Sequence, residues 1–160
     1  MKPIPVCMES EVPHDELIVS HTNLQGIITY VNDTFADISG YETDELIGKP
    51  HNIVRHPDMP SSFFNNLWRT LHEGKIWSGY IKNLRQDGGF YWVYAQVSQL
   101  FDKNGTLIGY KSLRSPVERV KRHELEQNYA RLKENEENLV KINQWVSQEI
   151  YAQISHLVKP

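Results

Sequence analysis

Two short runs near the start of the chain are rich in apolar, β-branched residues, at positions 17–20 and 26–31. The segment between them, residues 23–26, ends in Gly26, a residue that tight connections favour. We therefore expect the two runs to form a β-hairpin.

Helix signals follow the hairpin. Residues 32–34 offer capping side chains for a helix over about 33–39, and Gly40 supplies its stop. Thr43 begins a second capped turn that ends at Gly48 and Pro50. From Ser61 or Ser62 to Gly74, apolar residues recur at helical spacing and predict a longer amphipathic helix. They are Phe63, Phe64, Leu67, Trp68 and Leu71.

The next part of the chain changes to residues typical of strands. The runs at 76–84, 90–101 and 106–114 are separated by turn-forming residues at 86–89 and 102–105. This pattern predicts a three-stranded antiparallel meander. Together with the first hairpin it gives a five-stranded antiparallel sheet, with the short helices on one face, and the fold class α+β.

After Pro116 the chain becomes rich in charged and amide residues, and apolar residues recur every seven positions at Leu125, Leu132, Leu139 and Val146. This spacing predicts a long helix and favours a coiled coil that joins two copies of the chain into a homodimer. A single amphipathic helix folded back on the domain is the alternative. The expected organisation is an N-terminal leader (1–16), a folded domain (17–115) and a C-terminal helix (116–160), with a proline-containing leader that packs loosely or exchanges between subunits.

Composition limits the kinds of partner. A formal net charge of −3 without a basic cluster argues against nucleic acid. Cys7 is the only cysteine, so no disulfide can form within the chain, which fits a reducing cytoplasm. No stretch approaches the roughly 20 apolar residues that cross a bilayer. We expect a soluble, cytoplasmic protein, or the cytoplasmic part of a membrane-associated one.

The run Pro-His-Asn-Ile-Val-Arg-His-Pro-Asp-Met-Pro at residues 50–60 is the most informative part of the sequence. It places Arg55, His56 and Asp58 between prolines that stiffen a non-repetitive segment. These side chains would suit a phosphate-bearing ligand. Their alternative role is to cap the following helix and to form surface ion pairs.

Other chemistries find less support. His51 and His56 are the nearest approach to a metal-ligand pair, and their spacing fits no common metal motif. The chain has no phosphate-binding loop or nucleophile elbow, and no acid-base constellation outside the 55–58 run, so we do not expect an enzyme. Haem stays open, because one of the seven histidines would suffice as its axial ligand.

The predicted order of elements resembles the PAS sensory fold over residues 17–115. The local matches are Ile28-Thr29-Tyr30-Val31-Asn32, Phe35, Ser39-Gly40-Tyr41, Glu45-Leu46-Ile47-Gly48, Trp77-Ser78-Gly79, Asn83-Leu84-Arg85 and Gly88-Gly89-Phe90-Tyr91-Trp92-Val93. PAS domains bind haem, flavin, organic acids or nothing, so the fold alone does not identify a ligand.

The 50–60 run resembles the corresponding segment of bacterial aerotaxis receptors, whose PAS domains hold FAD non-covalently. This resemblance implies a redox or oxygen sensor that signals through its C-terminal helix to a downstream signalling domain or chemoreceptor partner. The implied FAD contacts are Asn32, Arg55, His56, Asp58, Trp77 and Asn83. For three of them a structural role is the alternative: a helix cap for Asn32, sheet-face core for Trp77 and a strand-edge contact for Asn83. Adduct photochemistry is disfavoured, because Cys7 lies outside the PAS region. A PAS interaction module that binds no cofactor, or another ligand, remains the alternative.

Overall fold

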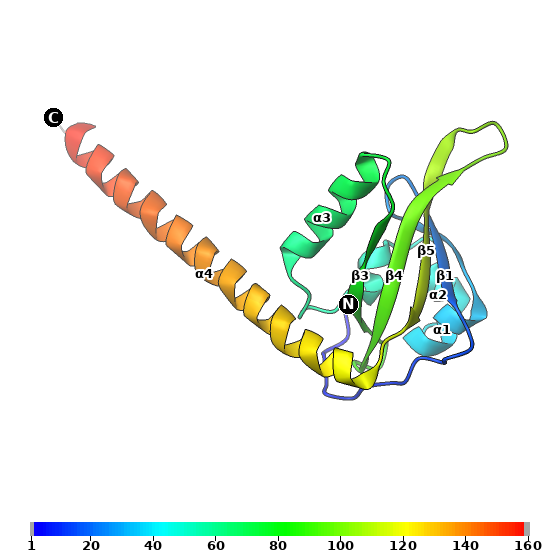
Figure 1. The fold of residues 1–160 in the computed structure, drawn as a ribbon. Coiled ribbons are helices and arrows are strands. Elements are labelled where there is room, and N and C mark those ends of the chain that lie inside the picture. The colour runs from blue at the N-terminus through cyan, green and yellow to red at the C-terminus, as the bar shows by residue number, and fades with distance from the viewer. Residues whose placement is uncertain (1, 159–160) are drawn as a thin grey trace.

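A five-stranded antiparallel sheet forms the centre of the molecule, in the order β2-β1-β5-β4-β3 (Figure 1). The computed structural model describes the backbone of residues 2–158 and the side chains of residues 2–153. The strands are β1 (Ile18–Asn23), β2 (Ile28–Val31), β3 (Trp77–Leu84), β4 (Phe90–Phe101) and β5 (Leu107–Pro116). The predicted α+β class, hairpin and meander are confirmed. Pairing of β1 with β5 joins the hairpin to the meander.

Four short or medium helices lie between β2 and β3 along the chain. They are α1 (Asp33–Ser39), α2 (Thr43–Leu46), the 3₁₀ helix η1 (His51–Val54) and α3 (Ser61–His72). The expectation of a non-repetitive segment over 50–60 was therefore wrong for residues 51–54, which form the 3₁₀ turn. Short 3₁₀ turns are common connectors, and Pro50 suits the position before the first helical residue.

The two faces of β4 pack against different parts of the molecule because side chains alternate along a strand. Tyr91, Val93 and Ala95 point into the main hydrophobic core, which also holds Phe35 of α1 and Leu67 of α3. Trp92 belongs to a smaller cluster on the other face, with Val117 and Leu125. The sheet thus has a helix-covered inner face and an outer face that receives the C-terminal helix.

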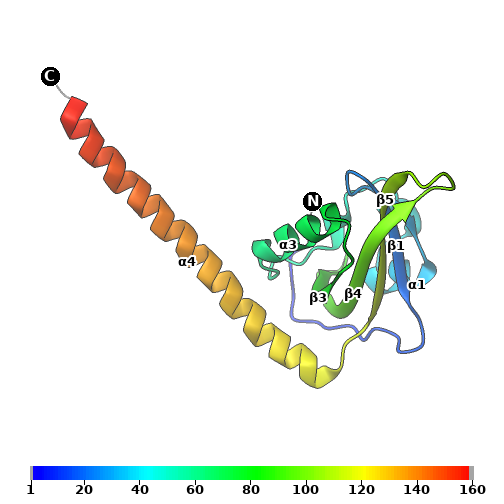
Figure 2. The same ribbon diagram turned by 45° about the horizontal axis from the view of Figure 1, so that its top comes forward.

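The predicted long helix is present as α4 (Arg119–Val158). Its first turns pack on the sheet, where Leu125 is buried and the Tyr129 hydroxyl donates to the Tyr80 carbonyl at 2.8 Å. It then runs away from the domain, as Figure 2 shows, and Leu132 and Leu139 are exposed. Its pairing with a second copy stays a prediction. None of the described helices has the length and apolar character that crossing a membrane requires.

The N-terminal segment packs against the domain more closely than expected. The Val6 amide donates to the Gly88 carbonyl, and the Phe90 amide donates to the Met8 carbonyl, both at 2.8 Å. Val12 is buried in the main core. The segment therefore covers the start of β4, where its backbone groups pair with the strand.

Candidate ligand-binding cavity

A cavity of about 250 Å³ lies between the inner face of the sheet and the helices. Strands β1, β3, β4 and β5 form its floor, and η1 and α3 form its wall. The lining residues include Ser20, His51, Arg55, Phe64, Trp68, Asn83, Ser112 and Arg114. Exposed Gln25 and Asn52 also line it, so the cavity reaches the surface.

Helix α3 forms the apolar wall because of its sequence period. Phe64, Leu67, Trp68 and Leu71 line the cavity at the spacing i, i+3, i+4 and i+7, which places them on one helical face. Trp68 also packs edge-on against Tyr110 of β5, with ring centroids 5.4 Å apart. The wall is thus an aromatic and aliphatic surface, well suited to a flat, largely apolar ligand.

Arg114 places a positive charge at the polar part of the cavity. The residue is buried, with only 5% of its surface exposed to solvent. Its Nε donates to the Ser112 hydroxyl at 2.9 Å. With the Asn83 amide oriented to satisfy both of its polar groups, the Asn83 oxygen accepts from Arg114 at 2.7 Å. Among the described residues Arg114 has no carboxylate partner, and burial lowers its pKa. A buried charge without a counter-charge is costly, so this position favours an electron-rich or anionic ligand atom.

His51 lies beside Arg114 and remains neutral near pH 7. Burial, and secondarily the charge of Arg114, lower the pKa of His51 to about 3. Its Nε2 lies 3.0 Å from the Ser20 hydroxyl and 3.4 Å from an Arg114 nitrogen. Since a protonated imidazole cannot accept, a neutral ring leaves His51 able to take a hydrogen bond from either neighbour.

Two of the six side chains proposed from the sequence come together at the cavity. Arg55 and Asn83 both line it, and their backbones form an isolated antiparallel bridge. The Arg55 guanidinium lies 3.8 Å from the centre of the Phe64 ring, a cation–π contact at the cavity wall. Asn83 also donates to the Val54 carbonyl at 3.2 Å in the same amide orientation.

Asn32 and Trp77 have partners elsewhere and do not line this cavity. The Asn32 side-chain oxygen accepts from the amides of Phe35 at 3.0 Å and Val19 at 3.1 Å, so it caps α1 and ties that helix to β1. The Trp77 indole donates to Asn66 at 3.1 Å and joins β3 to α3. Both residues position elements that surround the cavity.

His56 and Asp58 do not line the cavity: Asp58 lines a pocket beside α4, and His56 packs edge-on against Phe90 of β4. The Asp58 carboxylate lies 3.0 Å from the Lys82 ammonium, which also contacts Glu126 of α4 at 2.9 Å. Burial, followed by the charge of Lys82, lowers the pKa of His56 to about 4. Partial burial acts to raise the pKa of Asp58, but the hydrogen bond and charge of Lys82 outweigh it and lower that pKa. The 55–58 run therefore connects the cavity to the C-terminal helix.

Arg114 and His51 are not among the ligand contacts expected from the sequence. A signal for Arg114 was available: it follows Tyr110 and Ser112 at a spacing of two, so all three share one face of β5. A charged residue on the inner face of a predicted strand is uncommon and often functional. From the sequence, His51 was considered only as a metal-ligand partner of His56, and nothing local indicated that it would face the cavity.

Comparisons with known proteins agree with this architecture. A model of the PAS fold matches residues 28–114, more than half of the chain. The aerotaxis receptor of Escherichia coli is 48% identical over 101 residues, and the bacterioopsin transcriptional activator of Halobacterium salinarum is 29% identical over 107 residues. The chain therefore belongs to the PAS-fold family.

Both relatives are much longer than this chain. The matches cover 63% and 67% of the chain but only 20% of the receptor and 16% of the activator. Among solved structures, a PAS domain from Colwellia psychrerythraea has a TM-score of 0.57 at 22% identity, covering 63% of this chain and 86% of that one. The light-state Aureochrome1 LOV domain also has a TM-score of 0.57, at 23% identity, covering 78% and 92%. These two likenesses concern the fold.

Proposed function

We propose that this PAS domain binds FAD in the cavity and reports redox state or oxygen through α4, as part of an aerotaxis-type signalling pathway. The observation that carries the proposal is the buried Arg114, which faces the cavity without an acidic partner among the described residues. The resemblance of residues 50–60 to aerotaxis receptors supplies the identity of the ligand. The 48% identity to the Escherichia coli aerotaxis receptor supports the same assignment.

The cavity fits the chemistry of a flavin ring. The isoalloxazine system is flat, with an apolar benzenoid end and a polar end that presents oxygen and nitrogen atoms. Phe64 and Trp68 offer an apolar wall, while Arg114 and Asn83 offer donors at the polar part. A volume of about 250 Å³ lies below the roughly 300–1,000 Å³ of pockets that hold a whole ligand. The rest of FAD would therefore lie toward the open side, where Asn52 and Arg55 line the cavity.

A bound flavin supplies reversible electron transfer. The positive charge of Arg114 would favour negative charge in the cavity. His51, being neutral, would not compensate the charge of Arg114. Asn83 is placed to transmit a change in ligand charge, because it contacts both Arg114 and the Val54 carbonyl. Strand β3 would pass this change to α4, since Lys82 lies next to Asn83 and contacts Glu126. Such a signal requires the two redox states to interact differently with two protein conformations.

Reconstitution followed by absorption spectroscopy tests this function. Purified protein is incubated separately with FAD, FMN, riboflavin and haem, and bound ligand is quantified after desalting. We expect stoichiometric FAD in the wild type and strongly reduced FAD in R114M. R119Q, which removes an exposed arginine at the start of α4, serves as the matched control and should retain FAD. A wild-type protein that binds haem or no ligand would refute the proposal.

We also propose that α4 joins two copies of the chain and leads to a downstream signalling partner. The support is a line of apolar residues at seven-residue spacing, of which Leu132, Leu139 and Val146 are 49%, 59% and 40% exposed. Exposed apolar residues in such a repeat are typical of a coiled-coil seam.

A further inference from the structure

The N-terminus of α3 takes its capping group from a distant part of the chain. Pro60 occupies the cap position and provides no side-chain hydrogen bond. The Ser61 amide donates to one carboxylate oxygen of Glu136 at 2.9 Å, and the Ser62 amide donates to the other at 3.0 Å. Glu136 belongs to α4, so a residue 75 and 74 positions away satisfies the Ser61 and Ser62 donors, which a helix normally satisfies locally.

This cap is favourable electrostatically as well as geometrically. A carboxylate at a helix N-terminus interacts with the positive end of the helix dipole, and hydrogen bonds from amides to a charged acceptor are strong. Partial burial acts to raise the pKa of Glu136, but the hydrogen bonds from Ser62 and Ser61, and then the charge of Arg55, outweigh burial and lower the pKa. Glu136 is therefore ionised at neutral pH, in the state that caps best.

The capped helix is also the wall of the cavity. Phe64 and Trp68 lie one and two turns after Ser61 and line the cavity. Arg55 lies at the junction, because it lines the cavity and also lines the groove that contains Glu136. A displacement of the first turn of α3 would therefore move cavity-lining side chains.

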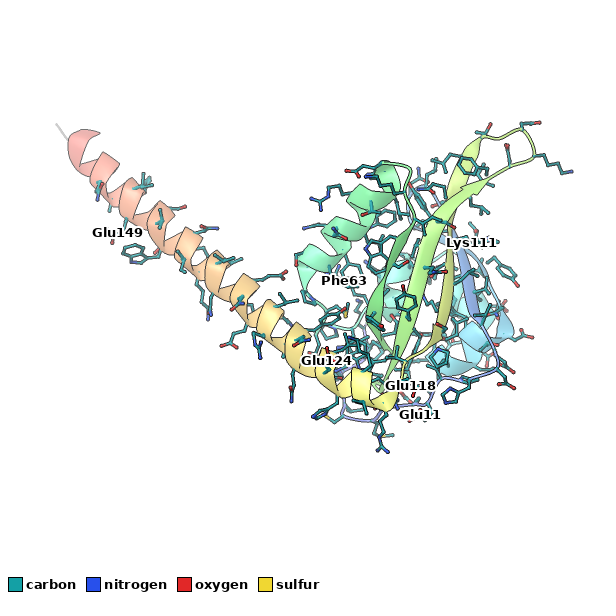
Figure 3. All side chains as sticks on the ribbon, in the orientation of Figure 1. Glu11, Phe63, Lys111, Glu118, Glu124 and Glu149 are labelled. Carbon is teal, nitrogen blue, oxygen red and sulfur yellow. The ribbon has the colours of Figure 1, made fainter. Side chains whose placement is uncertain are left out.

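Neighbouring contacts hold α4 beside the same turn. Lys133 of α4 donates to the Pro57 carbonyl. Tyr129 packs against Phe63 of α3, with ring centroids 5.7 Å apart. Figure 3 shows Phe63 on the side of α3 that faces α4, and Glu149 on the part of α4 far from the domain. Together with the Glu136 cap, these contacts join this part of α4 to the start of α3.

We propose that Glu136 is a positioning residue that fixes the cavity wall to the C-terminal helix through an exchangeable cap on α3. When α4 is docked, the carboxylate holds the first turn of α3 in place. When α4 moves away, this turn loses its cap and the cavity wall loosens. Linkage makes the effect reciprocal, so a ligand that displaces the α3 wall changes the docking of α4. This inference rests on the proposed function, in which α4 carries the signal away from the domain. It adds the contact that couples α4 to the cavity.

The test compares full-length E136A and E136Q with the wild type, all without ligand. E137Q is the control, because it removes one negative charge from the next residue, which has no described hydrogen bond to α3. Hydrogen exchange measured by NMR reports the protection of the Ser61 and Ser62 amides. The 5-fluorotryptophan resonance of Trp68, assigned with W68F, reports the cavity wall. Urea denaturation verifies that each variant is folded.

In E136A we expect the two amides to exchange at least roughly fivefold faster, the effect of losing one typical cap. The Trp68 resonance should shift in E136A, shift less in E136Q and stay unchanged in E137Q. Unchanged amide exchange in E136A would overturn the proposal, and so would faster exchange with an unmoved Trp68 resonance, because a purely structural contact gives that result. Absence of flavin binding by the wild type would refute the proposed function, while these ligand-free measurements still decide the role of Glu136.

Discussion

The ammonium group of Lys82 lies 2.9 Å from the carboxylate of Glu126, which joins edge strand β3 to helix α4. Lys82 is 6% exposed, and its ammonium also lies 4.3 Å from the centre of the Phe90 ring. The Glu126 carboxylate further accepts from the Trp92 indole at 3.0 Å. This buried cation therefore holds together the outer face of the sheet, the 55–58 run and the C-terminal helix.

Replacing Lys82 with methionine should destabilise the protein by about 1–3 kcal/mol, less than the loss of a fully buried pair because both acidic partners are partly exposed. Urea denaturation measures the change in the free energy of unfolding. K75M is the matched control: Lys75 pairs with Glu73 on the surface, so its loss should cost less than about 0.5 kcal/mol. If K82M and K75M lose the same free energy of unfolding, the buried contacts of Lys82 do not stabilise the fold more than a surface ion pair does.

Stability should decrease at mildly acidic pH because two histidines resist protonation in the folded state. The pKa values of His51 and His56 are lowered from 6.5 to about 3 and about 4. Between these values and 6.5 the unfolded chain binds more protons than the folded one, so the free energy of unfolding falls as the pH falls. Each histidine contributes a slope of up to about 1.4 kcal/mol per pH unit.

Urea denaturation at several pH values between 8 and 4.5 measures this slope. H51Q retains a polar side chain that does not titrate, so its stability should fall less steeply than that of the wild type. If the two curves run parallel over this range, His51 is not protonated on unfolding as described.

Asn32→Ala should lower stability by about 1–2 kcal/mol, since the variant loses a helix cap and a tie to β1. The side chain accepts from two amides and its amide group donates to the Leu17 carbonyl at 2.7 Å. We expect the folded variant to retain its FAD stoichiometry, measured by absorbance after desalting. Loss of FAD at unchanged stability would instead support a direct contact between Asn32 and the ligand.

Replacing both Leu132 and Leu139 with glutamate should convert a dimer into a monomer, because the change introduces charges into the proposed coiled-coil seam. Sedimentation velocity measures the oligomeric state. A double replacement of Glu134 and Glu149 with glutamine, outside the heptad series, should leave the dimer intact. A wild-type protein that is monomeric at all accessible concentrations would rule out the seam.

Much of the fold could be predicted because its determinants are local. The apolar spacing of α3 and the capping residue Asn32 each act within a few positions of the chain. The direction in which His56 and Asp58 face could not be predicted, because it depends on pairing between Arg55 and Asn83, 28 positions later. The same limitation applies to the cap of α3. Caps expected from the sequence lie within the 50–60 run, whereas the structure places Pro60 at the cap position and takes the acceptor from Glu136 of α4.

The Arg55–Asn83 bridge has a consequence for how far the connecting run can move. The bridge pairs backbone groups at the end of β3. This strand pairs with β4 along one edge, and no strand of the sheet pairs with it along the opposite edge. Detaching the run completely would leave these groups unpaired on an open strand edge, the feature through which sheets of separate molecules associate. The proposed sensor would therefore work best by small shifts around a closed bridge, and this pairing would limit how far the run can move.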